Sequence, residues 1–280
     1  MARLPLLERL DSGDHLCLIV DDDIAGREAL TDAVRAGLRG GDRVLYCSAD
    51  TVEALGRLRP AVEAIAGGDL RVRPIESSYL SAGVFHPAAA LRFLRQEVDD
   101  ARDAGYRGLR LLTDMSWASR SAPGVDRLPE YEAEANTIFA EGYAMAVCAY
   151  DPRLFDPLSR RGLAQAHLGT VATGEPFDPS SALRVRPVRE PFGIRLLGEA
   201  DLLNHAALRA VIDHLLGSLP GERATATVDL TQLRFIDTAA ARVLLLAYQR
   251  GAGRLKFVGR PTALARLFDL HGAGEPAGTV

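Results

Sequence analysis

Short apolar segments alternate with longer amphipathic segments from Asp14 to about Thr173. In the longer segments, apolar positions recur every three to four residues, which is the period of a helix with one buried face. Apolar strands separated by such helices are typical of an α/β fold with a parallel sheet flanked by helices. The predicted strands are Leu16–Val20, Val44–Ser48, Leu70–Pro74, Leu109–Thr113 and Ala144–Tyr150. The predicted helices are Ala25–Arg39, Thr51–Ile65, Ala88–Ala104 and Pro129–Glu141.

The alternation resumes on a smaller scale after a turn-rich break at Gly174–Ser181. The strands predicted there are Ile194–Leu197, Ala224–Leu230 and Arg254–Val258, with Arg184–Glu190 as an edge strand. The predicted helices are Asn204–Leu219, Thr238–Arg250 and Thr262–Leu270. We therefore expect a first domain at residues 1–175, a linker at 176–183, and a smaller α/β domain with a mixed sheet at 184–280.

Composition narrows the class of protein. With 280 residues and 48% hydrophobic content, the chain can bury a sizeable core. No apolar run approaches the roughly 20 residues that span a bilayer, so we expect no membrane association. The first residues carry acids and no small-residue cleavage site, which favours a cytoplasmic location. The net charge of −4, with arginines scattered among acids, argues against direct nucleic-acid binding.

Three cysteines, Cys17, Cys47 and Cys148, lie in apolar runs. An odd number of such cysteines indicates reduced thiols in the core and no disulfides. No pair has metal-ligand spacing, and none has a nearby histidine to complete a zinc set. We therefore expect neither a metal nor a cofactor.

The pair Asp237 and Thr238 stands where an apolar strand changes to the Thr238–Arg250 helix. Free backbone N–H groups and the positive end of the helix dipole gather at such a position, so a phosphate on Thr238 is locally tolerated. A phosphate there would add about −2 of charge next to Asp237. The alternative is that the pair serves only as a helix cap.

Residues from about 192 to 272, with GEADLLNHAAL near their start and VDLTQLRFIDTAAARVLL at their centre, resemble the STAS family of anti-sigma factor antagonists. In that family an Asp-Leu-Ser motif and an apolar strand end precede Asp-Ser-Ser/Thr-Gly-Leu, and a partner kinase phosphorylates the Ser after the Asp. Asp229–Thr231 match the first motif, Asp237 matches the second Asp, and Thr238 takes the position of the phosphorylated Ser. The chain departs from the family in having Thr as acceptor and three alanines, Ala239–Ala241, after it.

The loop after the first predicted strand carries three acids, Asp21–Asp23. A phosphate-binding loop would instead need several glycines and a Gly-Lys-Ser/Thr ending. Because like charges would face each other with no lysine to compensate, triphosphate binding by that route is disfavoured. The acids either hold a divalent cation or form a solvated turn and helix N-terminus; the turn is the commoner outcome.

A second distinctive stretch, Leu109–Trp117, ends an apolar strand with Asp114 and contains the single tryptophan. In RecA-like ATPases an acid at this position holds magnesium, but without a phosphate loop that role has no substrate. Trp117 and Met115 either line an apolar pocket at the strand end or belong to the core, which is the commoner place for such side chains.

Four segments in order resemble the MEDS domain, a sensory module of bacterial and archaeal regulators: GDHLCLIVDDD, GLRLLTDMSWA, PGVDRLPEYEAEAN and CAYDPRLFDP. The resemblance covers roughly residues 6–173 and implies a RecA/KaiC-like fold with a degenerate nucleotide site that senses a small organic ligand. The ligand-site residues it implies are His15, Cys17, Asp114, Trp117, Glu130, Tyr131, Glu132, Asn136, Tyr150 and Asp151. For His15, Tyr131 and Tyr150 the alternative is a buried, hydrogen-bonded structural role.

Together the two resemblances imply a signalling protein that is not an enzyme. The second domain would bind an anti-sigma factor or a GHKL-type serine-threonine kinase by partner switching, controlled by phosphorylation of Thr238. The docking residues expected around it are Asp237, Ala239, Arg242, Val243 and Leu246. Two other functions stay open, namely a scaffold without phosphorylation that responds to ligand or oligomeric state, and a nucleotide hydrolase. Whether the chain forms a homo-oligomer is also open.

Overall fold

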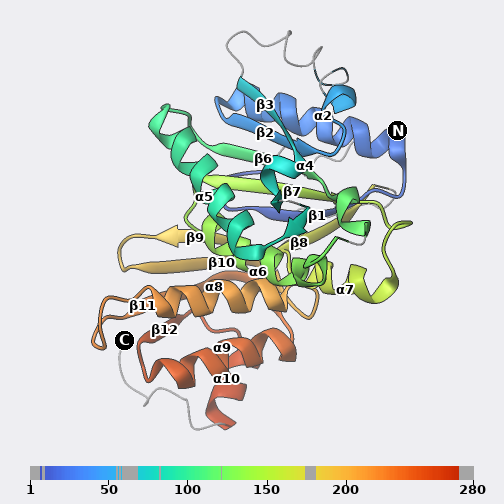
Figure 1. Cartoon of the computed structure of the whole chain (residues 1–280). Helices are drawn as coiled ribbons and strands as arrows, with labels where there is room; N and C mark the ends of the chain where they lie inside the picture. The colour runs from blue at the N-terminus through green and yellow to red at the C-terminus, as the bar shows by residue number, and fades with distance from the viewer. Residues whose placement is uncertain are drawn as a thin grey trace.

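Two β-sheets organise the part of the chain that the computed structural model describes (Figure 1). The described residues are 7, 10–54, 56, 58, 69–81, 83–120, 122–173 and 181–270. The larger sheet belongs to the first domain and the smaller one to the second. None of the helices in these ranges is both long enough and apolar enough to cross a membrane.

The first domain is built on a six-stranded parallel sheet in the order β3-β2-β6-β7-β1-β8. Every residue of β2 and β7 is buried, as expected for strands covered on both faces. The strands are β1 (His15–Ile19), β2 (Arg43–Ser48), β3 (Asp69–Pro74), β6 (Leu109–Asp114), β7 (Ala144–Tyr150) and β8 (Gly169–Ala172).

Helices cover both faces of this sheet. Helix α2 (Asp23–Gly40) packs on one face; it is capped by the Asp22 side chain at its start and by Gly41 in the left-handed conformation at its end. Helices α5 (Pro87–Asp103) and α6 (Leu128–Phe139) pack on the other face. The remaining elements are α4 (Ile75–Ser78), the hairpin β4 (Leu80–Ser81) and β5 (Val84–Phe85), the 3-10 helices η1 (Met115–Ser119) and η2 (Val125–Arg127), and α7 (Pro157–Gln165).

The second domain has a four-stranded mixed sheet in the order β12-β11-β10-β9, in which only β9 runs antiparallel to its neighbour. Its core combines the inner face of the sheet with α8, α9 and α10. The elements are β9 (Arg184–Val188), β10 (Gly193–Ala200), α8 (His205–Gly217), β11 (Ala226–Ile236), α9 (Thr238–Gly251), β12 (Leu255–Val258) and α10 (Thr262–Leu270).

The two domains share a contact surface. Helix α8 of the second domain packs against α6 of the first, below the larger sheet in Figure 1. Ala140, Leu168 and Leu183 join the core of the second domain. Arg186 Nη2 on β9 lies 2.9 Å from Oδ1 of Asp14, which is only 2% exposed. Apolar packing and an ion pair to a buried carboxylate therefore both hold the domains together.

The architecture agrees with the sequence prediction, and the differences lie in short elements. Each predicted strand is present, but β11 extends six residues beyond the predicted end at Leu230, and β8, α7 and the β4–β5 hairpin were not foreseen. The predicted Thr51–Ile65 helix is helical at residues 51–54, 56 and 58. Its remainder, most of the predicted linker and the tail after residue 270 lie outside the described residues.

Candidate functional site

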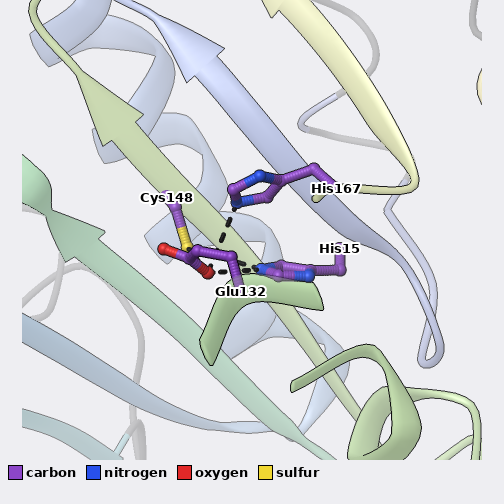
Figure 2. A group of neighbouring side chains, drawn as sticks. All are labelled: His15, Glu132, Cys148 and His167. Carbon is purple, nitrogen blue, oxygen red and sulfur yellow. Dashed lines mark hydrogen bonds and ion pairs between the residues drawn. The ribbon is translucent and has the colours of Figure 1, made fainter. Parts of the chain in front are cut away.

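Four polar side chains meet inside the first domain in what we call the His-Glu-Cys cluster: His15, Glu132, Cys148 and His167 (Figure 2). His15 is on β1, Cys148 on the neighbouring strand β7, and Glu132 on α6, which covers this face. His167 lies between α7 and β8. None of the four is more than 2% exposed.

The carboxylate of Glu132 is the centre of the cluster. Its Oε2 atom lies 3.3 Å from His15 Nε2 and 3.5 Å from His167 Nε2. The Sγ atom of Cys148 lies 3.7 Å from the same oxygen and 3.5 Å from His15 Nε2. One atom from each of the four side chains therefore falls within 4.8 Å of the other three.

Neighbouring groups fix how the two imidazoles are turned. His167 Nδ1 lies 2.7 Å from the carbonyl oxygen of Leu163, so this nitrogen carries the proton it donates. His15 Nδ1 lies 3.0 Å from Asn136 Oδ1. The Asn136 amide nitrogen lies within 2.9 Å of three backbone carbonyl oxygens that its two N–H groups share, which sets its oxygen as the acceptor for His15. In the neutral form, both histidines therefore direct the lone pair of Nε2 at Glu132.

The cluster places a carboxylate beside two imidazoles and a thiol in a dry environment. Burial lowers the pKa of His167 to about 4, so its imidazole is neutral at pH 7. Burial alone would raise the pKa of Glu132, but the imidazoles of His167 and His15 in their protonated forms, together with a 2.5 Å hydrogen bond from the Tyr150 hydroxyl, outweigh burial and lower that pKa. Burial also raises the pKa of the Cys148 thiol, which stays protonated. The geometry thus gathers two imidazoles and a thiol around one buried carboxylate.

Two of the aromatic residues implied by the MEDS resemblance, Trp117 and Tyr131, lie in a separate group, whereas Tyr150 contacts Glu132 of the cluster. Trp117 is 1% exposed and packs with Tyr79 and Phe85 at ring-centroid distances of 5.5 Å. Tyr131 is edge-on to both of those rings, and its hydroxyl donates to the hydroxyl of Tyr79. Of the two roles that the sequence left open for Trp117, the structure places it in the core.

Asp114 and Asp151 line a third place, a cavity of about 270 Å³ at the carboxyl ends of the strands. Arg153 pairs there with Asp151 at 2.7 Å and with Asp23 at 2.5 Å. Asp22 caps α2, as the turn interpretation of Asp21–Asp23 predicted. The acids of this loop are therefore already used by the protein, and the loop between β1 and α2 offers neither the glycines nor the lysine of a phosphate loop.

Glu130 does not join any of these groups. It is exposed, pairs with Arg127 and lines a cavity of about 550 Å³ between α5 and α6 of the first domain and α8 of the second. Cys17 lies opposite Cys148 across the β1–β7 pair and is fully buried. The single ligand site implied by the resemblance is thus distributed over separate places in the fold.

Cys148 and His167, which complete the His-Glu-Cys cluster, were missed by the sequence prediction. The expectation that no cysteine has a nearby histidine is wrong, because β1 and β7 are neighbours and bring together His15 and Cys148, 133 positions apart. The sequence contains only an indirect signal of the cluster, in the spacing of its residues. His15 and Cys17 alternate on one face of a buried strand, and Glu132 and Asn136 are four residues apart on one face of a helix.

In the second domain, Asp237 and Thr238 form the junction between β11 and α9. Asp237 Oδ1 accepts a hydrogen bond of 2.8 Å from the Ala240 N–H, and Oδ2 accepts one of 2.9 Å from the Leu202 N–H. Thr238 is exposed and is the first residue of α9. Asp237 therefore serves as the helix cap, while the Thr238 hydroxyl is accessible at the helix N-terminus.

The predicted docking face on α9 is only partly exposed. Arg242 and Leu246 are exposed and follow Thr238 at intervals of four residues, so they share its face of the helix. Ala239 is half-buried. The expectation that Val243 lies on this face is wrong, because its side chain points inward and is 4% exposed in the core of the domain.

Exposed apolar side chains flank this junction, some in sequence and some through the Leu202 contact. Leu202 and Leu203 are 42% and 57% exposed, and the Leu202 N–H is bonded to Asp237. Phe235, two residues before Asp237, is 50% exposed. Sequence reasoning did not select these residues, because a single apolar residue in a loop or at a strand end does not reveal whether it is buried.

Comparison with known proteins places both halves of the chain. Residues 14–168 match the family described as MEthanogen/methylotroph, DcmR Sensory domain (MEDS), and residues 183–276 match the family described as Mlab, STAS domain. No curated protein matches the chain.

Solved structures are similar at low sequence identity. A KaiC-like protein from Pyrococcus horikoshii OT3 has a TM-score of 0.42 and 13% identity, covering 66% of this chain and 78% of its own. The flagellar accessory protein FlaH from Methanocaldococcus jannaschii has a TM-score of 0.40 and 14% identity, covering 74% of this chain and 88% of its own.

Proposed function

The chain belongs to the MEDS family and carries a STAS domain after its MEDS domain, and from this premise we propose that it works by partner switching. In this proposal the second domain is an anti-sigma factor antagonist that binds an anti-sigma factor or GHKL-type serine-threonine kinase in the cytoplasm. Phosphorylation of Thr238 releases that partner. The first domain senses a small organic ligand or a further partner and is not an enzyme.

The observation that carries the proposal is the exposed Thr238 hydroxyl at the first position of α9. A kinase can reach the hydroxyl without unfolding the helix, because the capping role is taken by Asp237. The helix N-terminus tolerates a phosphate through its dipole and free N–H groups. Thr238 is therefore both reachable and able to hold the modified state.

The surroundings explain how a phosphate would release a partner. Leu246 on the exposed face of α9, Leu202, Leu203 and Phe235 provide apolar contact area. A phosphate on Thr238 places about −2 of charge beside Asp237 and raises the cost of desolvating that surface. A partner that docks over Thr238 would then lose affinity without any change in the fold of the domain.

A scaffold without phosphorylation is the second candidate, and the three alanines at Ala239–Ala241 are the observation that favours it. They replace the small polar residue, Gly and Leu that follow the acceptor in the STAS pattern. Nucleotide hydrolysis has less support, because the loop between β1 and α2 lacks the lysine and glycines that would hold a triphosphate. Lack of ATP turnover by the full chain is the expected result.

Binding measurements with three variants of the full chain test the proposal against the scaffold. Thr238→Ala should bind the anti-sigma partner as well as the unmodified chain, and Thr238→Glu should bind at least tenfold more weakly. Thr262→Glu is the matched control, since Thr262 is also an exposed first residue of a helix in this domain and should leave binding unchanged. Equal binding by the Thr238 alanine and glutamate variants would contradict the charge mechanism.

A further inference from the structure

Two observations in the His-Glu-Cys cluster bear on whether its centre can hold a cation. The first is the convergence of two imidazole nitrogens, a carboxylate oxygen and a sulfur within 4.8 Å of one another. The second is independent: His167 Nε2 is fully buried and has no hydrogen-bond partner. We propose that this cluster is a four-coordinate site for one divalent transition-metal ion, with Zn²⁺ as the ion it fits best.

The cluster lacks protons for the number of lone pairs it contains. Nε2 of His167 and Oε2 of Glu132 both present lone pairs, because His167 donates through Nδ1. The Cys148 thiol has one proton and can donate it to only one of these atoms. Acceptors that face each other in a dry interior are costly unless something positive lies between them. A metal ion supplies that positive charge to both at once.

The spacing agrees with tetrahedral coordination. With metal–nitrogen and metal–oxygen bonds of about 2.0–2.1 Å and a metal–sulfur bond of about 2.3 Å, the edges of a ligand tetrahedron are roughly 3.3–3.6 Å. Four of the six separations between the ligand atoms are 3.3, 3.5, 3.5 and 3.7 Å, and the other two, both at His167 Nε2, are within 4.8 Å. The side chains thus stand nearly at ligand distance before any ion is present.

The donor types select the ion. Imidazole nitrogen, carboxylate oxygen and thiolate sulfur together suit Zn²⁺, whereas Ca²⁺ and Mg²⁺ prefer oxygen alone. Binding a divalent ion displaces the Cys148 proton to solvent. The charges of the thiolate and the Glu132 carboxylate then balance the ion, so the filled site is neutral.

Further contacts hold each ligand in place, as is usual around metal ions. Asn136 accepts from His15 Nδ1, the Leu163 carbonyl accepts from His167 Nδ1, and the Tyr150 hydroxyl donates to Glu132 Oε1. Because all four ligands come from the protein and are buried, no coordination position is left open for a substrate. The site is therefore structural or sensory. Its ligand Glu132 stands on α6, the helix against which α8 of the second domain packs.

Cobalt substitution of the full chain tests the site. The metal-free protein, prepared with a chelator, should bind one equivalent of Co²⁺. It should show both a thiolate-to-cobalt charge-transfer band and the intense visible bands of tetrahedral Co²⁺, and Zn²⁺ should abolish both. Cys148→Ser should remove the charge-transfer band. The matched control is Cys47→Ser, because Cys47 is equally buried but lies on β2, two strands from β7. This variant should keep the charge-transfer band.

A second measurement uses the unmodified chain, so it can be read even if the variants fold poorly. Zn²⁺ should raise the Tm of the metal-free full chain. His167→Gln should weaken Zn²⁺ affinity by more than the roughly 10–100-fold that loss of a supporting contact costs. A folded metal-free chain that gives no thiolate-to-cobalt band and no Zn²⁺ shift in Tm would overturn the proposal and leave the cluster as a buried His–Glu network. No anti-sigma partner enters either measurement, so this outcome is independent of the partner-switching proposal.

Discussion

Asp237 makes two structural hydrogen bonds at the start of α9, and two substitutions distinguish their contributions. Its Oδ1 atom caps the helix at Ala240, and its Oδ2 atom holds the Leu202 N–H of the loop after β10. Alanine at position 237 removes both hydrogen bonds. Asparagine keeps an oxygen for the cap but presents an amide N–H₂ group to the Leu202 N–H, so it removes only the second.

The magnitudes follow from the two contacts. Loss of an aspartate cap costs about 1 kcal/mol, and asparagine caps as well as aspartate. The bond to Leu202 is exposed, so its loss costs about 0.5 kcal/mol, at the low end for a hydrogen bond. We therefore expect Asp237→Asn to lower the free energy of unfolding by about 0.5 kcal/mol and Asp237→Ala by about 1.5 kcal/mol.

Urea unfolding of the full chain, followed by circular dichroism, measures these differences. The free energy of unfolding should be highest for the unmodified chain, lower for Asp237→Asn and lowest for Asp237→Ala. An alanine variant as stable as the asparagine variant would show that Asp237 does not cap α9 in solution. The asparagine variant is also the right one for binding studies, since it changes the charge beside Thr238 and keeps the helix start.

Three further predictions concern the core, the domain contact and pH. Trp117→Ala should lower the free energy of unfolding by about 3–5 kcal/mol in urea, because Trp117 is 1% exposed; a cost below about 1 kcal/mol would place it at an open pocket. Arg186→Ala should cost about 2 kcal/mol in the same assay, because it removes a charged hydrogen bond to buried Asp14, whereas the exposed Arg189→Ala should cost little. For Asp229, burial would raise the pKa, but hydrogen bonds from Thr231 and Arg195 lower it. Because the pKa of Asp229 is lower in the folded chain than the unfolded value of about 3.9, its ionised carboxylate stabilises the folded state above that pH. The unmodified chain should therefore exceed Asp229→Asn in free energy of unfolding by the full amount above about pH 5, and by less as the pH falls below about 5. A difference that does not change with pH would contradict this.

The sheets were predictable because their strands are continuous apolar runs. The predicted Ala144–Tyr150 strand coincides with β7, every residue of which is buried. The predicted order of a MEDS domain followed by a STAS domain is also confirmed. By contrast, β8 was missed because Gly169–Ala172 is four residues long and includes a glycine and a threonine, which give no clear apolar run.

The chemical groupings were harder to predict, because they depend on the order of strands in space. His15, Glu132, Asn136 and Tyr150 were selected by resemblance and do lie together. Cys148 and His167 join them only because β7 and β8 flank β1, a placement that hydrophobic periodicity does not reveal. On α9, periodicity identified the exposed Arg242 and Leu246, but the inward direction of Val243 depends on how the helix is rotated against the sheet.

Phosphate mapping tests the central claim most directly. The full chain and its Thr238→Ala variant should be incubated with ATP and the GHKL-type kinase that binds it, and the modified residue located by mass spectrometry. The account predicts a single phosphate on Thr238 of the unmodified chain and none on the variant. A chain that binds the kinase but carries no phosphate on Thr238, or carries the same phosphate in both proteins, would contradict it.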